Sequence, residues 1–235
     1  DTPCDYAKQG ILYIAEALPD PAAQREEFEV AARDEVVALA SAGSAGRQVS
    51  FGENTVLKVQ DLAKFDFKGI DIALSSPGAK VSAEHSPRAA KAGAVVIDNT
   101  SYWRMDPDVP LVIPEINPQE LRRHKGIVAN PNCSTAIALM GLYPLHKAFG
   151  LKRFFASTYQ AVSGTGAEAM RELDTQVRAW AKGEASPPKV YPHTIAFNLI
   201  PQVDSFLDDG YTKEEMKMLN EGRKIMNLPN LKVST

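Results

Sequence analysis

Ala-Asn-Pro-Asn-Cys-Ser-Thr, residues 129–135, joins two segments of different character. Residues 126–129 form an apolar run typical of a buried strand, and residues 134–149 have the pattern of a helix. Asn-Pro-Asn is typical of turns, so we expect Cys133 at or near the N-terminus of that helix. Unpaired backbone N–H groups and the helix dipole there favour a thiolate, the form of cysteine that acts as a nucleophile. Position alone is equally compatible with a small, buried and inert cysteine.

Upstream of this turn, short continuous apolar runs are typical of fully buried strands. Buried strands that alternate with helices indicate an α/β domain. Its parallel sheet would be covered on both faces, with ligands at the carboxyl ends of the strands. We predict strands at 36–40, 71–74, 94–97, 111–113 and 127–129, a hairpin around 52–54, and a helix at 80–92 with Ser82 as a possible cap and Gly93 as its stop.

From about residue 151 the pattern changes to α+β. We predict a charged helix at 212–226, because Thr212 and Glu215 have the spacing of a capping box. A domain boundary is expected at residue 132, between an α/β domain at 1–132 and an α+β domain at 133–235. Within the second domain we also predict a strand at 153–162, a helix from after Gly166 to about Lys182, a loop at 183–192 and an extended segment at 197–203.

The composition excludes several classes of protein. Of the 235 residues, 44% are apolar and 23% charged, and the net charge is −3, which favours neither nucleic-acid nor membrane binding. No apolar run is long enough to span a bilayer, and the N-terminus does not have the pattern of a signal peptide. Cys4 and Cys133 are the only cysteines, which excludes a disulfide framework and favours a reducing, cytoplasmic location. The cysteines and the four histidines lack metal-ligand spacing, so we expect no metal site.

Five motifs, in order along the chain, resemble the aspartate-β-semialdehyde dehydrogenase family over about residues 36–235. A single Asn-Cys pair would be weak evidence, whereas five ordered motifs are specific. The motifs are Ile-Asp-Asn-Thr-Ser-Tyr-Trp-Arg-Met-Asp-Pro-Asp-Val-Pro-Leu-Val-Ile-Pro-Glu-Ile-Asn (97–117), Ala-Asn-Pro-Asn-Cys-Ser-Thr (129–135), Ser-Thr-Tyr-Gln-Ala-Val-Ser-Gly-Thr-Gly (157–166), Ile-Ala-Phe-Asn-Leu-Ile-Pro-Gln-Val-Asp (195–204) and Glu-Glu-Met-Lys-Met-Leu-Asn-Glu (214–221).

The resemblance implies an activity and its partners. Enzymes of this family interconvert β-aspartyl phosphate and aspartate semialdehyde with NADP and inorganic phosphate, in the biosynthesis of lysine, threonine, methionine and isoleucine. The resemblance further implies that residues 1–132 form a Rossmann-like nucleotide-binding domain and residues 133–235 a catalytic and dimerisation domain. A homodimer or homotetramer would form through this second domain. A cytoplasmic location is expected, with a plastid as the alternative. Other phosphorylating, thiol-dependent dehydrogenases, which act on glyceraldehyde 3-phosphate or an acylglutamyl phosphate, place different residues around their cysteine.

The resemblance also assigns roles to individual residues. Cys133 aligns with the nucleophile and Gln160 with the residue that orients the substrate beside the thiol. Arg104 aligns with a phosphate-binding arginine, Lys217 with a second phosphate cation, and Glu214 with a contact to the substrate amine. Asn132 is placed to donate to the same phosphate. Outside these motifs, an exposed Arg, or an exposed Glu-Lys pair three residues apart on a helix, would be read as surface.

A second set of residues is expected to contact the cofactor. Glycine and small polar residues at strand ends allow the close approach of a dinucleotide, although they are common in turns anyway. In the segment after residue 40, Gly43 stands where the family commonly has an arginine that binds the adenosine 2′-phosphate, so NAD remains a second possible cofactor, with Arg47 as an alternative phosphate ligand. The residues in this set are Ser41, Ser44, Ser75, Gly78, Asn99, Ser163, Gly164 and Asn198.

Two features of the family pattern are not recognisable in the sequence. Residues 1–35 contain only Gly10 and not the glycine loop that cradles the cofactor pyrophosphate, although 11–15 is apolar and 21–33 has a polar helical pattern. The arginine and the histidine acid/base that follow the Val-Ser-Thr segment in the family are also absent, because residue 235 ends that segment. We therefore expect a partial copy of an active enzyme. The alternative is a non-catalytic remnant that dimerises or binds ligands.

Overall fold

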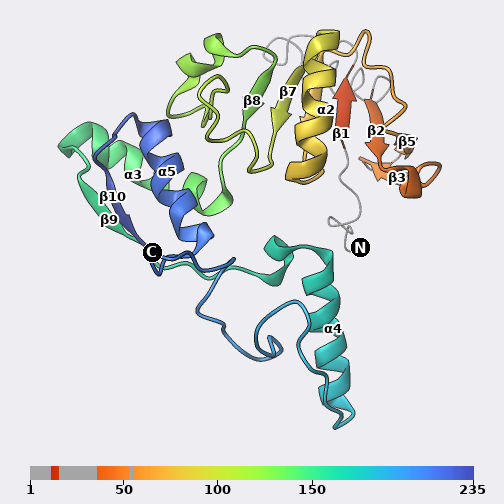
Figure 1. Cartoon of the computed structure of the whole chain (residues 1–235), viewed down its shortest axis with the longest axis vertical. Helices are drawn as coiled ribbons and strands as arrows, with labels where there is room; N and C mark the ends of the chain where they lie inside the picture. Colours follow the sequence, from red (N-terminus) through yellow and green to blue (C-terminus); the bar gives the residue numbers. More distant parts are fainter. Residues whose placement is uncertain (1–11, 16–35, 53–54) are drawn as a thin grey trace.

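The computed structural model describes residues 12–15, 36–52 and 55–235. The first half of the chain folds around a six-stranded sheet with the order β5-β2-β1-β6-β7-β8 (Figure 1). The strands are β1 Leu12–Ala15, β2 Val36–Ala40, β5 Gln60–Asp61, β6 Ile72–Ser75, β7 Val95–Asp98 and β8 Ile127–Ala129. Gly10, Cys4, the predicted helix at 21–33 and the centre of the predicted hairpin turn at 53–54 lie outside the described residues.

The part of the sheet that matters for the site is parallel, as predicted. Strands β6, β7 and β8 run side by side, with Ser75 opposite Asp98 and Asp98 opposite Ala129. Their carboxyl ends therefore meet at one edge of the sheet. Strand β1 is the exception, because it pairs antiparallel with both β2 and β6. An apolar run marks a buried strand but does not set its direction.

Helix α2, Ala79–Ala92, packs against β6, β7 and β8 and ends at Gly93, whose φ of 112° only glycine adopts readily. Ser82 was expected as the cap, but the cap position is Gly78. Ser82 is instead buried and donates a hydrogen bond to Asp98. The Ser82 hydroxyl thus provides a hydrogen bond to a buried carboxylate beneath the helix. A capping residue would instead have to lie at the N-terminus of the helix.

Only one face of the sheet is covered by a helix within the described residues. Leu74 and Ile97 point to the face opposite α2 and remain 46% and 39% exposed. The expectation of a sheet covered on both faces is therefore not met in the described part of the chain. The core lies on the α2 side, where Leu39, Ala73, Val96, Leu111 and Ala129 are almost completely buried.

Residues 111–113 are buried but do not form the predicted strand. Leu111 makes a single parallel bridge to Ala129, and the Val112 N–H donates to the Ala129 carbonyl. Pro110 and Pro114 flank the segment. Because proline has no N–H, a longer ladder against β8 cannot form there. The predicted hairpin is present as β3, Gln48–Phe51, paired antiparallel with β4, Thr55–Lys58.

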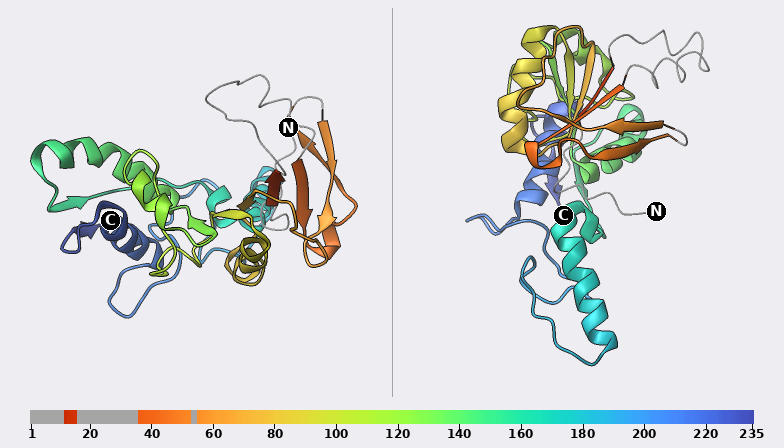
Figure 2. Two further views of the ribbon diagram at one scale, coloured as in Figure 1. Left: turned by 90° about the horizontal axis from the view of Figure 1, so that it is seen from above. Right: turned by 90° about the vertical axis from the view of Figure 1, so that its right-hand side faces the viewer.

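The second half begins with helix α3, Cys133–Phe149, which packs against helix α5, Lys213–Met226. Thr212 and Glu215 form the predicted capping box of α5. Strand β9, Arg153–Phe155, pairs in parallel with β10, Lys232–Ser234. The predicted strand at 153–162 is shorter because its partner offers only this three-residue ladder. The view from above groups these elements beside the sheet (Figure 2, left).

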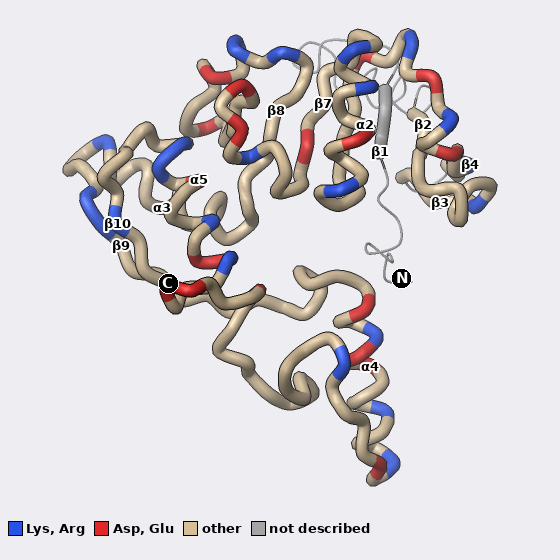
Figure 3. The backbone as a smooth tube through the Cα atoms, in the orientation of Figure 1, with Lys and Arg blue, Asp and Glu red and all other residues tan. Residues whose placement is uncertain are grey.

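Helix α4, Ala167–Ala181, and the irregular chain that follows it extend away from the sheet as an arm, which we define as residues 167–211 (Figure 1 and Figure 2, right). The predicted loop at 183–192 is confirmed, whereas 197–203 forms no strand and Phe197 has a φ of 59°. The Trp180 and Phe197 rings pack against each other 4.8 Å apart, yet both remain exposed. No described helix is long and apolar enough to cross a membrane. Acidic and basic residues are interspersed along the described chain (Figure 3).

Candidate active site

Cys133 is the first residue of α3 and is exposed, as expected for a cysteine at a helix N-terminus. Asn132 caps the helix because its side-chain Oδ1 accepts hydrogen bonds from Ser134 N at 3.0 Å and Thr135 N at 3.2 Å. The thiol Sγ lies 4.0 Å from the Ser134 hydroxyl. Because the cap fixes the backbone on either side of it, Cys133 is held at the surface rather than packed into the core.

Glu214 connects several of the sequence-predicted site residues. Its Oε1 accepts a hydrogen bond from Asn132 Nδ2 at 2.9 Å and one from Gln160 Nε2 at 3.3 Å. Its Oε2 accepts a hydrogen bond from Lys217 Nζ at 2.9 Å. Three residues predicted from separate motifs thus meet on one carboxylate. One of them, Asn132, directly precedes Cys133 in the chain.

The charges around Glu214 stabilise one another. Burial alone would raise the pKa of Glu214, but bonds from Lys217 and Asn132 outweigh it and lower that pKa. Burial would likewise lower the pKa of Lys217, but Glu214 and Asp204 raise it. Asp204 Oδ2 lies 3.2 Å from Lys217 Nζ. At neutral pH the cluster therefore contains two carboxylates and one ammonium group.

Arg104 is buried rather than exposed, with only 7% of its surface accessible. Its Nε donates to the Asn130 carbonyl at 2.9 Å and its Nη2 to the Asn99 carbonyl at 2.9 Å. Its Nη1 forms an ion pair with Glu221 at 3.1 Å. Since a guanidinium group has five N–H donors, three of them are engaged by described residues.

Glu221 was not predicted as a site residue, yet it lies between two that were. Its side chain is 2% exposed, and its Oε2 accepts a hydrogen bond from the Asn132 backbone N–H at 2.7 Å. Burial raises the pKa of Glu221, opposed by the Arg104 charge. The signal that could have found it is helical spacing, because Glu221 lies seven residues after Glu214 and four after Lys217 on α5.

The carboxyl edge of β6, β7 and β8 lies directly beside this cluster. Asn99 N donates to the Ser75 carbonyl and Asn130 N to the Asp98 carbonyl. The segments that follow β7 and β8 are therefore hydrogen-bonded to the ends of β6 and β7. The Asn130 Nδ2 donates to Asn99 Oδ1 at 2.7 Å. Because Arg104 bonds to the carbonyls of both asparagines, the predicted cofactor edge and the cysteine turn form one continuous network.

The described residues at this edge suit a dinucleotide. Gly78 has a φ of 90°, and no atom lies within 4 Å of the position where a Cβ would stand. The N-terminus of α2, which follows Gly78, has no side-chain cap, and a helix N-terminus offers N–H groups to a phosphate. Ser41 is exposed and Ser44 is buried after the carboxyl end of β2. Open space also surrounds Gly43.

The remaining predicted cofactor contacts are not joined to the cluster by hydrogen bonds among the described residues. Ser163 and Gly164 lie in an exposed 3₁₀ turn at Val162–Thr165, directly after Gln160. Asn198 lies in the arm, where it donates to the Thr194 carbonyl at 2.9 Å. Within residues 36–52 and 55–235, no group of His, Cys, Asp and Glu has the arrangement of a metal site.

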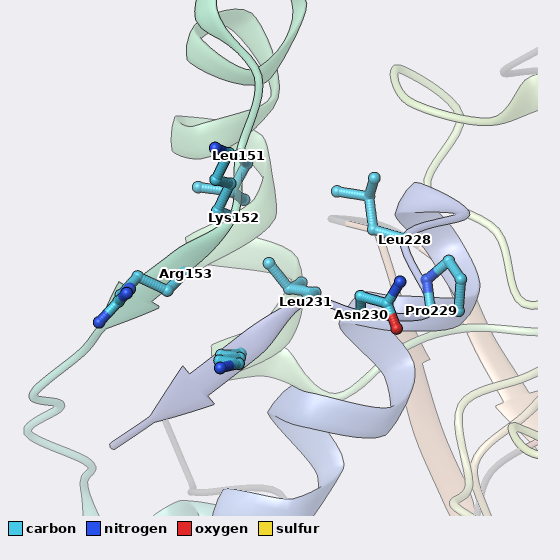
Figure 4. Close-up of a pocket in the computed structure, with 8 residues that line it drawn as sticks. Leu151, Lys152, Arg153, Leu228, Pro229, Asn230 and Leu231 are labelled. Carbon is cyan, nitrogen blue, oxygen red and sulfur yellow. The ribbon is translucent and has the colours of Figure 1, made fainter.

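A surface hollow lies apart from the cluster, between the start of β9 and the turn before β10 (Figure 4). None of the predicted site residues lines it. The lining combines apolar side chains with three cations, one on each strand and one just before β9: Leu151, Lys152, Arg153, Leu228, Pro229, Asn230, Leu231 and Lys232. The chemistry of the cysteine turn therefore has to be sought at the exposed face of α3 and not in this hollow.

Two family models match the chain. The NAD binding domain of semialdehyde dehydrogenases matches residues 26–124, and the dimerisation domain of semialdehyde dehydrogenases matches residues 142–235. An aspartate-semialdehyde dehydrogenase of Aquifex aeolicus is 52% identical over 205 residues, which is 86% of this chain and 60% of the relative. One of Bacillus subtilis is 49% identical over 208 residues, with the same coverage of 86% and 60%.

A solved structure supports the same relationship. The aspartate semialdehyde dehydrogenase II of Vibrio cholerae, complexed with ASA, is 45% identical, with a TM-score of 0.79 over 83% of this chain and 59% of that one. The chain thus spans about 60% of the length of these two curated relatives.

Proposed function

The chain belongs to the semialdehyde dehydrogenase family, and from this premise we propose that it contributes the nucleophile and the substrate cluster of an aspartate-semialdehyde dehydrogenase. The reaction is the NADPH-dependent reductive dephosphorylation of β-aspartyl phosphate to aspartate semialdehyde. In the reverse direction, aspartate semialdehyde, NADP and inorganic phosphate are consumed. Relatives at 52% and 49% identity carry the name of this activity.

One observation carries the proposal: Glu214 gathers Asn132, Gln160 and Lys217 directly beside the exposed Cys133. The sequence predicts Asn132 and Lys217 for the phosphate and Gln160 for the orientation of the acyl group. A cluster with this composition meets the needs of acyl transfer from a phosphate, namely a thiol, cations and amide donors. The exposed Cys133 follows Asn132, one member of this cluster, and a remnant without function would not require that arrangement.

The residues perform the following steps in this proposal. The Cys133 thiolate forms a bond to the acyl carbon, the bond from that carbon to the phosphate oxygen breaks, and inorganic phosphate leaves. Arg104 and Lys217 supply positive charge for the phosphate, and Asn132 contributes an amide at the same place. Gln160 orients the acyl group beside the thiol. Glu214 is ionised, since its pKa is lowered, and binds the substrate ammonium group.

We further propose that the nicotinamide cofactor would lie along the carboxyl edge of β6 and β7. Its reduced form, NADPH, would supply the hydride that converts the thioester to the aldehyde and frees the Cys133 thiolate. Ser75, Gly78 and Asn99 would hold the cofactor at the open N-terminus of α2, with Ser41 and Ser44 towards the adenosine. Ser163 and Gly164 would approach from beyond Gln160, and Asn198 from the arm. Because Gly43 lacks a cation for the 2′-phosphate, NAD is the second candidate cofactor.

A homodimer, or a homotetramer built from dimers, completes the proposal. The family model over residues 142–235 describes a dimerisation domain. The arm also exposes Trp180 by 66%, Phe197 by 72% and Leu199 by 72%, which is a large apolar surface for a monomer. Sedimentation at micromolar concentration should give at least twice the mass of one chain. The cytoplasmic location stays a prediction.

The proposed activity is tested by NADP- and phosphate-dependent oxidation of aspartate semialdehyde. Turnover should require both phosphate and NADP and should disappear in Cys133→Ala. Ser163→Ala serves as a comparison: it removes a hydroxyl from the proposed cofactor site and leaves the thiol intact, so it should raise the KM for NADP without abolishing turnover. Phosphate-independent turnover, or turnover that survives in Cys133→Ala, contradicts the proposal.

A further inference from the structure

Glu221 is a buried carboxylate with two partners that come from distant parts of the chain. Its Oε1 pairs with Arg104 Nη1 at 3.1 Å, and its Oε2 accepts the Asn132 backbone N–H at 2.7 Å. Arg104 lies on the loop after β7, and Asn132 on the turn that starts α3. One side chain on α5 therefore holds two segments of the proposed site at once.

The contact from Glu221 to Asn132 affects the proposed nucleophile, because Asn132 directly precedes Cys133 in the chain. Asn132 uses its side chain to cap α3 at Ser134 and Thr135, and Cys133 lies between the capping residue and the residues that are capped. Fixing the Asn132 N–H therefore fixes the first turn of α3. Since Cys133 is the first residue of that helix, its orientation depends on this turn.

The contact from Glu221 to Arg104 links α5 to the carboxyl edge of the sheet. The same guanidinium group donates to the carbonyls of Asn99 and Asn130, which follow β7 and β8. A second cation on α5 holds the same loop, because Lys224 Nζ donates to the carbonyls of Arg104, Asp106 and Val109 at 2.8, 2.7 and 2.9 Å. The loop is thus attached to α5 at two points, one helical turn apart.

Chemistry explains why this position needs a carboxylate. Both terminal atoms of Glu221 act as acceptors, one for a guanidinium and one for a backbone N–H. Glutamine has nearly the same shape but one acceptor and one donor, so it can satisfy only one of the two. Stability alone is a weak reason for the pair, because apolar replacements of buried ion pairs are often neutral or stabilising.

We propose that Glu221 is a positioning residue, which holds Arg104 and the turn of Cys133 in one fixed arrangement for the acyl-transfer step. Glu221 itself does not touch the substrate. It acts through Asn132 on the thiol and through Arg104 on the proposed phosphate site. The inference rests on the proposed function for its catalytic consequence, but its structural consequence can be measured without turnover.

The test compares Glu221→Gln with the matched control Glu172→Gln. Glu172 is also buried and accepts backbone N–H groups, from Lys189, Val190 and Tyr191, but it lies on α4. Amide hydrogen exchange is read at Ser134 and Thr135, whose N–H groups bond to Asn132 and not to Glu221. Steady-state kinetics with aspartate semialdehyde are measured on the same preparations, per folded molecule.

Glu221→Gln should speed exchange at Ser134 and Thr135 by about tenfold or more, because the cap loses its anchor. It should also lower kcat by about 10- to 100-fold with KM changed by less than about threefold, as misplacement of a reacting group does. The control should leave both readouts at wild-type values and speed exchange at residues 189–191 instead. If Glu221→Gln does not fold, Glu221→Asp carries the same test, because it keeps the charge but is too short to reach both partners.

Wild-type exchange at Ser134 and Thr135 in the Glu221 variant overturns the inference, whatever the kinetics. Faster exchange with an unchanged kcat overturns it as well, since the arrangement would then have no catalytic consequence. If the wild-type chain shows no turnover, the proposed function fails, and the exchange rates alone decide whether Glu221 positions the turn.

Discussion

The cysteine turn and the cofactor edge are neighbouring regions of this molecule, yet they are built in different ways. Around Cys133, buried and half-buried charges hold one another through direct bonds, and helix α5 supplies Glu214, Lys217 and Glu221 from one face. At the cofactor edge, Ser41, Gly78 and Asn99 are exposed and lie in turns. The difference indicates that the substrate side is fixed before a ligand binds, whereas the cofactor side offers an open surface.

The largest effect should come from the cysteine itself. Cys133→Ala removes the atom that forms the thioester, so turnover should fall by at least about 10⁴-fold, as for other lost nucleophiles. NADP affinity, measured by fluorescence titration, should stay within about twofold, because the edge does not depend on the thiol. A loss of cofactor binding in the same variant would show that the two regions are not separate.

Arg104→Lys should have the next largest effect. Lysine keeps the charge but cannot form the three-way contact to Glu221, Asn99 and Asn130 that the planar guanidinium makes. We expect kcat/KM for phosphate to fall by about 10²-fold, since the proposed phosphate site loses its geometry. Wild-type phosphate kinetics in this variant would contradict the role of Arg104. Lys64→Arg, at an exposed lysine, serves as a control for a charge-conserving change.

A change at the cofactor edge should move the preference between cofactors and leave the cysteine turn alone. Gly43→Arg introduces a cation into open space, without a backbone conformation that requires glycine. The ratio of kcat/KM for NADP to that for NAD should rise by about tenfold, because the guanidinium can pair with a 2′-phosphate. Gly43→Gln is the matched control without charge. An equal shift in both variants would exclude the electrostatic explanation.

The smallest expected effect is on the pH dependence of folding, where two carboxylates of α5 should act in opposite directions. Burial raises the pKa of Glu221, so its contribution to stability is present below the ordinary value of 4.5 and is lost as pH rises through the raised pKa. The pKa of Glu214 is lowered, so its contribution is present above 4.5 and is lost as pH falls through the lowered pKa.

Urea unfolding from pH 3 to 8 checks the direction of each pH dependence. The difference in unfolding free energy between wild type and Glu221→Gln should decrease as pH rises above about 4.5. The difference between wild type and Glu214→Gln should decrease as pH falls below it. The same slope for both variants would mean that the two carboxylates share one environment.

The sequence predicted the features that depend on neighbouring residues. Cys133 at a helix start follows from the Asn-Pro-Asn turn, and the start of α5 follows from the spacing of Thr212 and Glu215. The buried strands around the site follow from their apolar runs. These signals involve residues close together in the sequence, so they can be read without knowledge of the rest of the fold.

Features that depend on distant partners were missed. Glu221 is separated by 117 residues from Arg104 and by 89 from Asn132. Its spacing places it on the same face of α5 as Glu214 and Lys217, but that spacing does not show that it is buried. The strand predicted at 153–162 is short because β10 pairs only with its first three residues. Burial of Arg104 likewise follows from the packing of α5 and not from the sequence around it. The division into domains at residue 132 and the assigned roles of the site residues stay predictions.

The most direct test of the account is to trap the acyl group on the thiol. The protein is mixed with freshly made β-aspartyl phosphate in the absence of a reduced cofactor, digested, and analysed by peptide mass spectrometry. We predict an aspartyl thioester on the peptide that contains Cys133, which hydroxylamine removes and which is absent in Cys133→Ala. An unmodified Cys133 peptide, or equal modification of Cys4, would contradict the account.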